Sequence, residues 1–193
     1  RKSRIPKKKD AWKISFVTSF NRDMLKRHKE KLYIFGENNV CYKTGEAWRK
    51  KGGPTDEDQT SPCYQTSTQA IIRGETNAAP IITTIIKDKK RLPVNDKVKD
   101  KLKKYIPINV TNILKDLRSE KYNEVVFSDK LVGTGVAQLN NSDIWTFVLQ
   151  QIARLKPNNA ETPDVHTMNL EHFKAWLSNK PVHNIKSHLS RLT

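Results

Sequence analysis

Residues 80–86 read PIITTII, the most strand-like stretch of the chain. Isoleucine and threonine are β-branched and favour extended backbone. The stretch has two β-branched runs and no strict alternation of apolar and polar residues, which is typical of a strand buried on both faces, as in parallel sheets. We therefore expect PIITTII to form a central strand, with helices packed against each face of its sheet.

Three further runs predict strands around this one. They are rich in aromatic or β-branched residues, and they are WKISFVT at 12–18, LYIF at 32–35 and YNEVVF at 122–127. Helical patterns lie between them, one over 21–31 beginning at Asn21 and one over 65–73 ending at Gly74. Residues 40–64 hold three glycines and two prolines and show little periodicity, which predicts a long surface loop.

The second half of the chain predicts further helices. Within the charge run 87–104, apolar residues recur at helical spacing, so this helix should bury one stripe and expose a basic face. Pro107 is expected to break or kink it, and a second helix should follow. Asn141 or Ser142 should cap another helix near 144–155.

These alternating strands and helices indicate an α/β fold with a mostly parallel central sheet and helices on both faces, a Rossmann-like arrangement. We expect one domain, with a helical appendage at its C-terminal end. The predicted organisation is a flexible basic arm over 1–10, the α/β domain over 11–156, and a linker with a helical extension over 157–193.

Charge is the strongest compositional signal of the chain. Its 193 residues include 36 Lys and Arg against 20 Asp and Glu, a formal net charge of +16 that favours polyanionic partners. No apolar run is long enough for a transmembrane helix, so no membrane partner is expected. Two cysteines are too few for a disulfide scaffold, which favours a reducing, cytoplasmic setting.

The basic residues fall in clusters rather than evenly along the chain. Clustered Lys and Arg can contact nucleic-acid phosphates with little sequence preference, and we expect double-stranded DNA as the target. The candidate nucleic-acid-binding residues are Arg1, Lys2, Arg4, Lys7, Lys8, Lys9, Arg49, Lys50, Lys51, Lys87, Lys89, Lys90, Arg91, Lys101, Lys103 and Lys104.

Two predicted strands end in turns that could hold a phosphate. LYIF runs into GENN at 36–39, and YNEVVF leads to a GTG loop at 133–135. Glycine lets backbone N–H groups approach an anion, and ligands of open α/β sheets bind at the carboxyl ends of strands. The candidate nucleotide-binding residues are Gly36, Asn38, Asn39, Gln69, Arg73, Gly133, Thr134 and Gly135.

The order FGENN, QAIIRGETNA and VVFSDKLVGTGVA resembles a family of uncharacterised proteins of phages and bacteria. That family shows FGDN, then Gln-Ala, then Arg-x-Glu-x-Asn-Ala, and finally Gly-x-Gly-Thr-Gly-x-Ala before a helix. The matching positions here are Phe35, Gly36, Asn38, Gln69, Ala70, Arg73, Glu75, Asn77, Ala78, Gly133, Thr134, Gly135 and Ala137. The layout is also similar to a macrodomain, which implies an ADP-ribose-type ligand. Lys130, Leu131 and Val132 depart from the family's pattern, so a degenerate pocket is a further alternative.

Two functions from different classes follow from these residues. The first is a phage-encoded DNA-binding protein that acts in host takeover in the infected cell's cytoplasm or nucleoid. The second is a nucleotide-binding protein or enzyme that uses the FGENN and GTG loops. A third hypothesis is an inhibitor of a host nucleic-acid-binding protein, with an acidic host protein as its partner. The sequence assigns no catalytic residue, metal ligand or cofactor, so binding without turnover is favoured.

Overall fold

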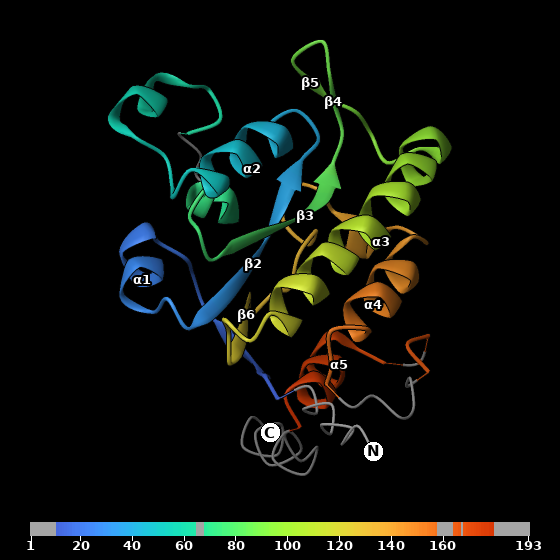
Figure 1. Cartoon of the computed structure of the whole chain (residues 1–193). Helices are drawn as coiled ribbons and strands as arrows, with labels where there is room; N and C mark the ends of the chain where they lie inside the picture. Colours follow the sequence, from blue (N-terminus) through green and yellow to red (C-terminus); the bar gives the residue numbers. More distant parts are fainter. Residues whose placement is uncertain (1–10, 65–67, 158–163, 167, 180–193) are drawn as a thin grey trace, which may run out of the picture.

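The computed structural model describes residues 11–64, 68–157, 164–166 and 168–179. It shows an α/β fold with a Rossmann-like layout (Figure 1). Four strands, all paired in parallel, form the central sheet in the order β1-β6-β2-β3. These strands are Lys13–Val17 (β1), Lys31–Asn38 (β2), Ala78–Thr84 (β3) and Glu124–Ser128 (β6). The predicted fold class is therefore confirmed.

Both faces of the sheet are covered, and β2 shows how. Its side chains alternate, so Leu32 and Ile34 join a core with α3 and α4, while Tyr33 and Phe35 join a smaller one with α1 and η2. The helices are α1 (Arg22–Arg27), α2 (Tyr42–Lys50), α3 (Asp96–Arg118), α4 (Trp145–Ala153) and α5 (Leu170–Leu177). Short 3₁₀ helices are η1 (Asp56–Thr60), η2 (Gln69–Ile72) and η3 (Leu139–Asn141).

The PIITTII strand, β3, is buried along most of its length, but it lies at the edge of the sheet and not at the centre. Its outward N–H groups are satisfied without a further strand. The N–H of Ala78 donates to the Glu75 carbonyl (3.1 Å), Pro80 has no N–H, and the N–H of Ile82 donates to Asn109 Oδ1 on α3 (2.9 Å). Proline in a strand is compatible with this edge position, since it removes a ladder donor.

Strand β2 is longer than expected, because it continues through Gly36, Glu37 and Asn38 instead of ending at Phe35. Those residues pair with β3 on one side only. On the other side, the pairing with β6 stops at Ile34, opposite Phe127. The sheet therefore opens between β2 and β6 at its carboxyl edge.

The predicted loop 40–64 contains helix α2 and the short η1. Asn38 Oδ1 accepts hydrogen bonds from the N–H groups of Val40 and Cys41, which turns the chain from β2 into α2. A disulfide joins Cys41 to Cys63. The cysteine count did not predict this bond, and it stands against the reducing setting inferred from that count, because disulfides are rare in reducing compartments.

The helix predicted within the basic segment 87–104 forms and buries Val98 and Leu102, but the start of the segment and the effect of Pro107 differ from the prediction. The first residues of the segment form a hairpin of β4 (Ile86–Lys87) and β5 (Lys90–Arg91), because Asp88 and Lys89 both adopt positive φ, as in a type I′ turn. The helix then begins at Asp96 and continues through Pro107 to Arg118 as one element. Buried Ile106 and Val110 flank the proline in the main core, so packing holds the helix together there.

The C-terminal part also differs in detail from the prediction. Helix α4 begins at Trp145 with Ile144 as its N-cap, a few residues after the expected caps, and η3 ends at Asn141. Of the predicted 65–73 helix, the described residues form the short η2. Phe173 and Leu177 of α5 pack in the main core. The arm 1–10 and the end of the extension, 180–193, lie outside the described residues. None of the described helices is long and apolar enough to cross a membrane.

Candidate functional site

The opening between β2 and β6 is bridged by one side chain from η2. Gln69 Oε1 accepts from the Gly36 N–H (3.2 Å), and Gln69 Nε2 donates to the Leu131 carbonyl in the loop after β6 (2.8 Å). The amide thus takes the place of the missing strand pairing. Carboxyl ends of parallel strands, where neighbouring connections diverge, are the usual ligand position in such sheets.

The GTG loop lies directly beside this opening. Gly133 has φ +78°, and a Cβ there would meet Leu139 Cδ1 at 2.9 Å. Packing and backbone conformation therefore both favour glycine at this position. A Cβ on Gly36 would stand 3.1 Å from Thr83 Oγ1, a tight contact in which the Thr83 side chain would have to shift. Gly135 differs, because a Cβ there would have no atom within 4 Å. It borders open space that a ligand could enter.

A pocket of about 250 Å³ brings together four of the eight candidate nucleotide-binding residues. Its floor and walls combine glycine backbone with hydroxyl groups, and it is lined by Gly36, Thr68, Gln69, Thr83, Thr84, Gly133, Gly135, Val136 and Ala137. The sequence analysis missed Thr83 and Thr84, which lie in the predicted strand PIITTII. Their position after Ile81 and Ile82, at a strand end, was the available signal.

The other four candidates make contacts within the fold. Asn38 Oδ1 accepts from the N–H groups of Val40 and Cys41 ahead of α2, and Asn39 exchanges two hydrogen bonds with the backbone of Ile86. Thr134 Oγ1 donates to the Lys130 carbonyl at 2.9 Å. Arg73 is 3% exposed and forms a two-pronged ion pair with Glu37, and its third contact is the Cys63 carbonyl.

The residues of the RGETNA motif, at 73–78, also make contacts within the fold. Glu75 accepts from Arg22 Nη1 at 2.9 Å. Asn77 is 1% exposed, and its Nδ2, which has two N–H groups, lies within hydrogen-bond distance of three backbone carbonyls around α1, those of Leu25, His28 and Lys31. Buried polar groups need such partners, so this motif is explained by the packing of α1 and η2 on the sheet.

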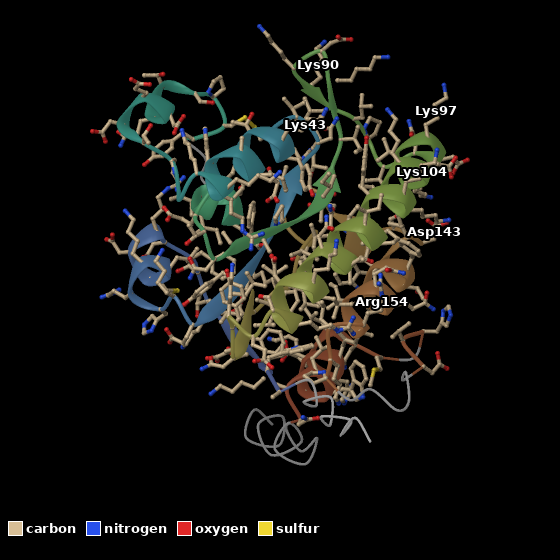
Figure 2. All side chains as sticks on the ribbon, in the orientation of Figure 1. Lys43, Lys90, Lys97, Lys104, Asp143 and Arg154 are labelled. Atoms are coloured by element: carbon tan, nitrogen blue, oxygen red, sulfur yellow. A yellow bond between two sulfur atoms is a disulfide. The ribbon has the colours of Figure 1, made fainter. Side chains whose placement is uncertain are left out.

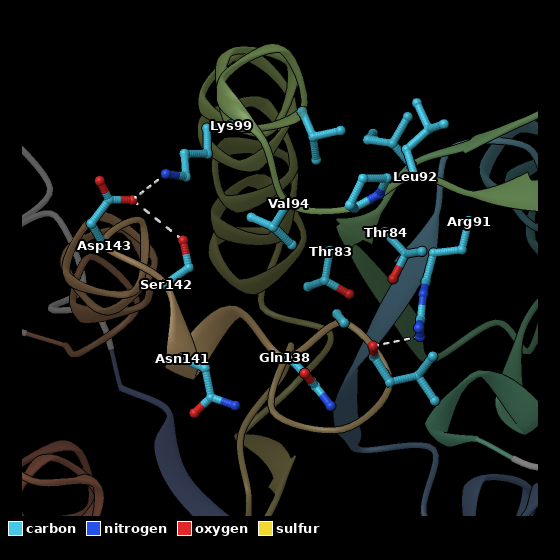
Figure 3. Close-up of a pocket in the computed structure, with 15 residues that line it drawn as sticks. Thr83, Thr84, Arg91, Leu92, Val94, Lys99, Gln138, Asn141, Ser142 and Asp143 are labelled. Carbon is cyan, nitrogen blue, oxygen red and sulfur yellow. Dashed lines mark hydrogen bonds and ion pairs between the residues drawn. The ribbon is translucent and has the colours of Figure 1, made fainter.

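A larger cleft of about 570 Å³ adjoins the small pocket and shares Thr83, Thr84, Val136 and Ala137 with it (Figure 3). One end is bordered by Arg91, whose Nη1 donates to the Val136 carbonyl at 2.5 Å. The other end is bordered by Lys99 and Asp143, which form an ion pair at 2.7 Å. The hydrogen bond from the Lys99 ammonium lowers the pKa of Asp143 and raises that of Lys99.

Exposed cations of the β4–β5 hairpin and of α3 form a basic face next to this cleft. On α3, the spacing of three and four residues places its lysines on one stripe, and Lys90, Lys97 and Lys104 extend outward in Figure 2. We define the basic face as Lys87, Lys89, Lys90, Arg91, Lys97, Lys101 and Lys104. The list of candidates omitted Lys97, although helical spacing from Lys101 and Lys104 could have identified it.

The remaining basic candidates lie elsewhere. Arg49 is half-buried and bonds Asp116 at 2.6 Å, while Lys50 and Lys51 are exposed at the C-terminal end of α2, where Lys51 pairs with Asp58 (2.7 Å). Lys103 borders a groove between α3 and α4. The candidates Arg1 to Lys9 lie outside the described residues. Among the residues that are described, no three His, Cys, Asp or Glu side chains are placed to share a metal ion.

Fold and site define an α/β protein of Rossmann-like layout with a cleft at the carboxyl edge of its sheet. Residues 15–148 match the sequence model of a family of unknown function, DUF7831, and the chain belongs to that family. Membership of an uncharacterised family was predicted and is confirmed. No curated protein and no solved structure matches the chain.

Proposed function

We propose that the protein binds nucleic acid, and that its basic face contacts the phosphates of double-stranded DNA. The observation that carries this proposal is the density of cations from the hairpin onto α3. Residues 87–104 hold nine Lys and Arg against three Asp. All seven residues of the basic face are exposed. A polyanion gains from such a surface through the release of its counterions.

The shape of the basic face favours contact with the backbone over readout of bases. Lys97 and Lys104 are seven residues apart on α3, which is about 10 Å along a helix. Their ammonium groups are point charges on flexible stems and suit phosphates, which carry no sequence information. Tyr105 and Ile108 are also exposed on α3, where they could contact sugars beside the lysines. We therefore expect low sequence preference.

The test is DNA affinity across a salt series, in wild type and in two matched triple variants. The first variant changes Lys97, Lys101 and Lys104 to Gln on the basic face. The second changes Lys26, Arg27 and Lys29 to Gln in and just after α1, and so removes the same charge elsewhere. A fluorescently labelled duplex and anisotropy at several salt concentrations give both the affinity and its salt slope.

We expect the α3 variant to lose about 10-fold or more in affinity and to reduce the salt slope by about three. The α1 variant should lose much less, because net charge alone acts weakly at a distance in salt. Equal losses in the two variants would show that DNA responds only to total charge. That result would remove the basic face as the binding site.

A second candidate is a nucleotide of the ADP-ribose type, held in the small pocket. It is favoured by the glycine backbone that lines the pocket at Gly36, Gly133 and Gly135, and by the open space beside Gly135, which leaves room for a phosphate. The check is the thermal shift of wild type and Gly135→Val with ADP-ribose. A shift that the variant abolishes supports this candidate, and a wild type without any shift rejects it.

The cellular setting is a further part of the proposal. We propose a phage protein that acts on DNA in the infected cell, on the Lys-, Asn- and Ile-rich composition and on the family resemblance, and in that reducing setting Cys41 and Cys63 would be thiols. Through the same basic face it could instead occupy an acidic host protein as an inhibitor. A one-to-one complex with such a protein, in salt that abolishes DNA binding, would favour the inhibitor.

A further inference from the structure

The large cleft is bigger than a phosphate group needs, and the proposed contacts of the basic face do not use its interior. We propose that this cleft takes one unpaired nucleoside phosphate, with the base between its apolar walls and the phosphate at Arg91. The inference rests on the proposed nucleic-acid binding, since Arg91 belongs to both surfaces. A volume of about 570 Å³ falls in the usual range for small-molecule sites.

Apolar residues from two different parts of the chain line the cleft. Leu92, Pro93 and Val94 lie where the hairpin leads into α3. Val136 and Ala137 directly follow the GTG loop, and Val136 is 59% exposed. A flat aromatic base gains by leaving water between such surfaces, whatever its identity.

The charges at the two ends give the ligand a direction. Arg91 borders one end of the cleft (Figure 3) and itself belongs to the basic face, close in sequence to Lys89 and Lys90. The opposite end carries Asp143, which its ion pair with Lys99 keeps in the charged form. A phosphate is attracted to the first end and gains little at the second. The phosphate therefore belongs at Arg91, and the base points towards Asp143.

Neutral polar groups lie along the path of the base. The side-chain amides of Gln138 and Asn141 border the lower side of the cleft in Figure 3, and the Thr83 and Thr84 side chains lie at its centre. Amides both donate and accept hydrogen bonds, which suits the edges of bases. A base in this cleft would then be held by its edge as well as by its faces.

The same ligand chemistry has two sources, a free nucleotide or an unpaired nucleotide of a strand. The strand is favoured, because the cleft opens beside the basic face and Arg91 lies in both. A paired base inside a duplex cannot reach the cleft without leaving its stack. The protein should therefore prefer DNA that has a single-stranded overhang to fully paired DNA.

The experiment compares a duplex carrying a short overhang with a blunt duplex of the same number of phosphates. AMP is added as a competitor in a third arm. The test variant is Val136→Glu, which places a carboxylate at the cleft rim near Arg91. The matched control is Val40→Glu, because Val40 is also an exposed valine (55%), follows β2 near the hairpin, and does not line the cleft. Both variants change the net charge equally.

We expect wild type to bind the overhang duplex about 10-fold more tightly than the blunt duplex, the scale of burying part of one base against aliphatic side chains. Val136→Glu should abolish that preference, and Val40→Glu should keep it. AMP should compete with the overhang duplex only. Equal wild-type affinity for the two duplexes, with a steep salt slope, would overturn the cleft inference and leave the proposed function standing. Binding of AMP without binding of either DNA would overturn the strand as the source, together with the proposed function.

Discussion

Gly133 and Gly135 stand two residues apart in one loop, and the structure gives them different tasks. Gly133 has positive φ and lies against Leu139, whereas Gly135 has neither a positive φ nor a close neighbour. Gly133→Ala should therefore lower the free energy of unfolding by about 1–3 kcal/mol through strain and overpacking. Gly135→Ala should leave it within about 0.5 kcal/mol. Urea unfolding of the two variants beside wild type provides the measurement.

Equal destabilisation by the two substitutions would contradict the different tasks of Gly133 and Gly135. The result also decides whether a substitution at Gly135 can be used to test ligand binding. Because a side chain at Gly135 meets only open space, Gly135→Val is a probe of binding that should not disturb the fold. A ligand effect at this position can then be attributed to the pocket itself.

Asp58 is the carboxylate for which a titration can be predicted from local contacts. The Lys51 ammonium and the Thr55 N–H both donate to it, and they lower the pKa of Asp58 to about 2. The folded pKa lies below the ordinary value of 3.8, so the stabilising contribution is present above about pH 4 and is lost as pH falls towards 2. NMR titration of the side-chain carboxyl should show a midpoint near 2.

Lys51→Ala should move that midpoint up towards the ordinary value, since the largest cause of the shift is the hydrogen bond from Lys51. Lys50→Ala removes the same charge one residue earlier and should move the midpoint much less. If both variants moved it equally, the cause would be the general positive field around α2 rather than the specific pair.

At the level of elements, the disulfide Cys41–Cys63 ties the start of α2 to the segment that follows η1. The Cys63 carbonyl also accepts from Arg73, so the bond holds a partner of the buried ion pair. The cysteines are separated by 22 residues in sequence. Replacing both with Ala should lower the free energy of unfolding by about 2–4 kcal/mol, because the unfolded chain gains freedom.

Dithiothreitol provides the matching control for this prediction. It should lower the melting temperature of wild type to that of the double variant and leave the variant unchanged. Thiol titration of the unfolded wild type, without reductant, should find no free cysteine. Two free thiols in that assay would show that the bond does not form, and would restore the reducing setting that the cysteine count favoured.

Strands could be predicted from the sequence because their signals are local. Aromatic and β-branched runs mark β1, β2, β3 and β6, and all four form. The order of the strands is not local, so PIITTII was placed at the centre although Pro80 is typical of an edge. Helix α2 was hidden because Gly45 interrupts its pattern. That glycine is needed for tertiary contact, since a Cβ there would meet Arg73 Cγ at 2.7 Å.

At the scale of the whole molecule, the candidate site was predictable only in its parts. The basic run and the two glycine turns are visible in the sequence, because composition alone marks them. Their arrangement depends on β6 lying between β1 and β2, which sets the GTG loop beside Gly36 and Thr83. The cleft also needs the β4–β5 hairpin, and the sequence marks that segment only as part of a basic run. No local sequence pattern predicts contacts between segments that are far apart in the chain.

The N-terminal arm carries positive charge that lies outside the described residues. Residues 1–9 hold six Lys and Arg and no acidic residue, so deleting them lowers the formal charge from +16 to +10. Ile5 is the one large apolar residue among them, and little apolar area is lost. The melting temperature should therefore change by less than about 2 °C, while DNA affinity at low salt should fall.

Salt dependence separates the arm from the basic face. If the full chain makes about six to ten phosphate contacts, its affinity should fall roughly 10³–10⁵-fold between 50 and 200 mM salt. If the arm contacts phosphates, the chain without residues 1–9 should show a shallower salt slope than the full chain. Changing Lys97, Lys101 and Lys104 to Gln in that shortened chain should reduce the slope further. An unchanged slope after deletion would mean that the arm's charge does not reach the DNA. The basic face would then account for the binding without the arm, because the contacts that set the slope would all lie on the folded domain.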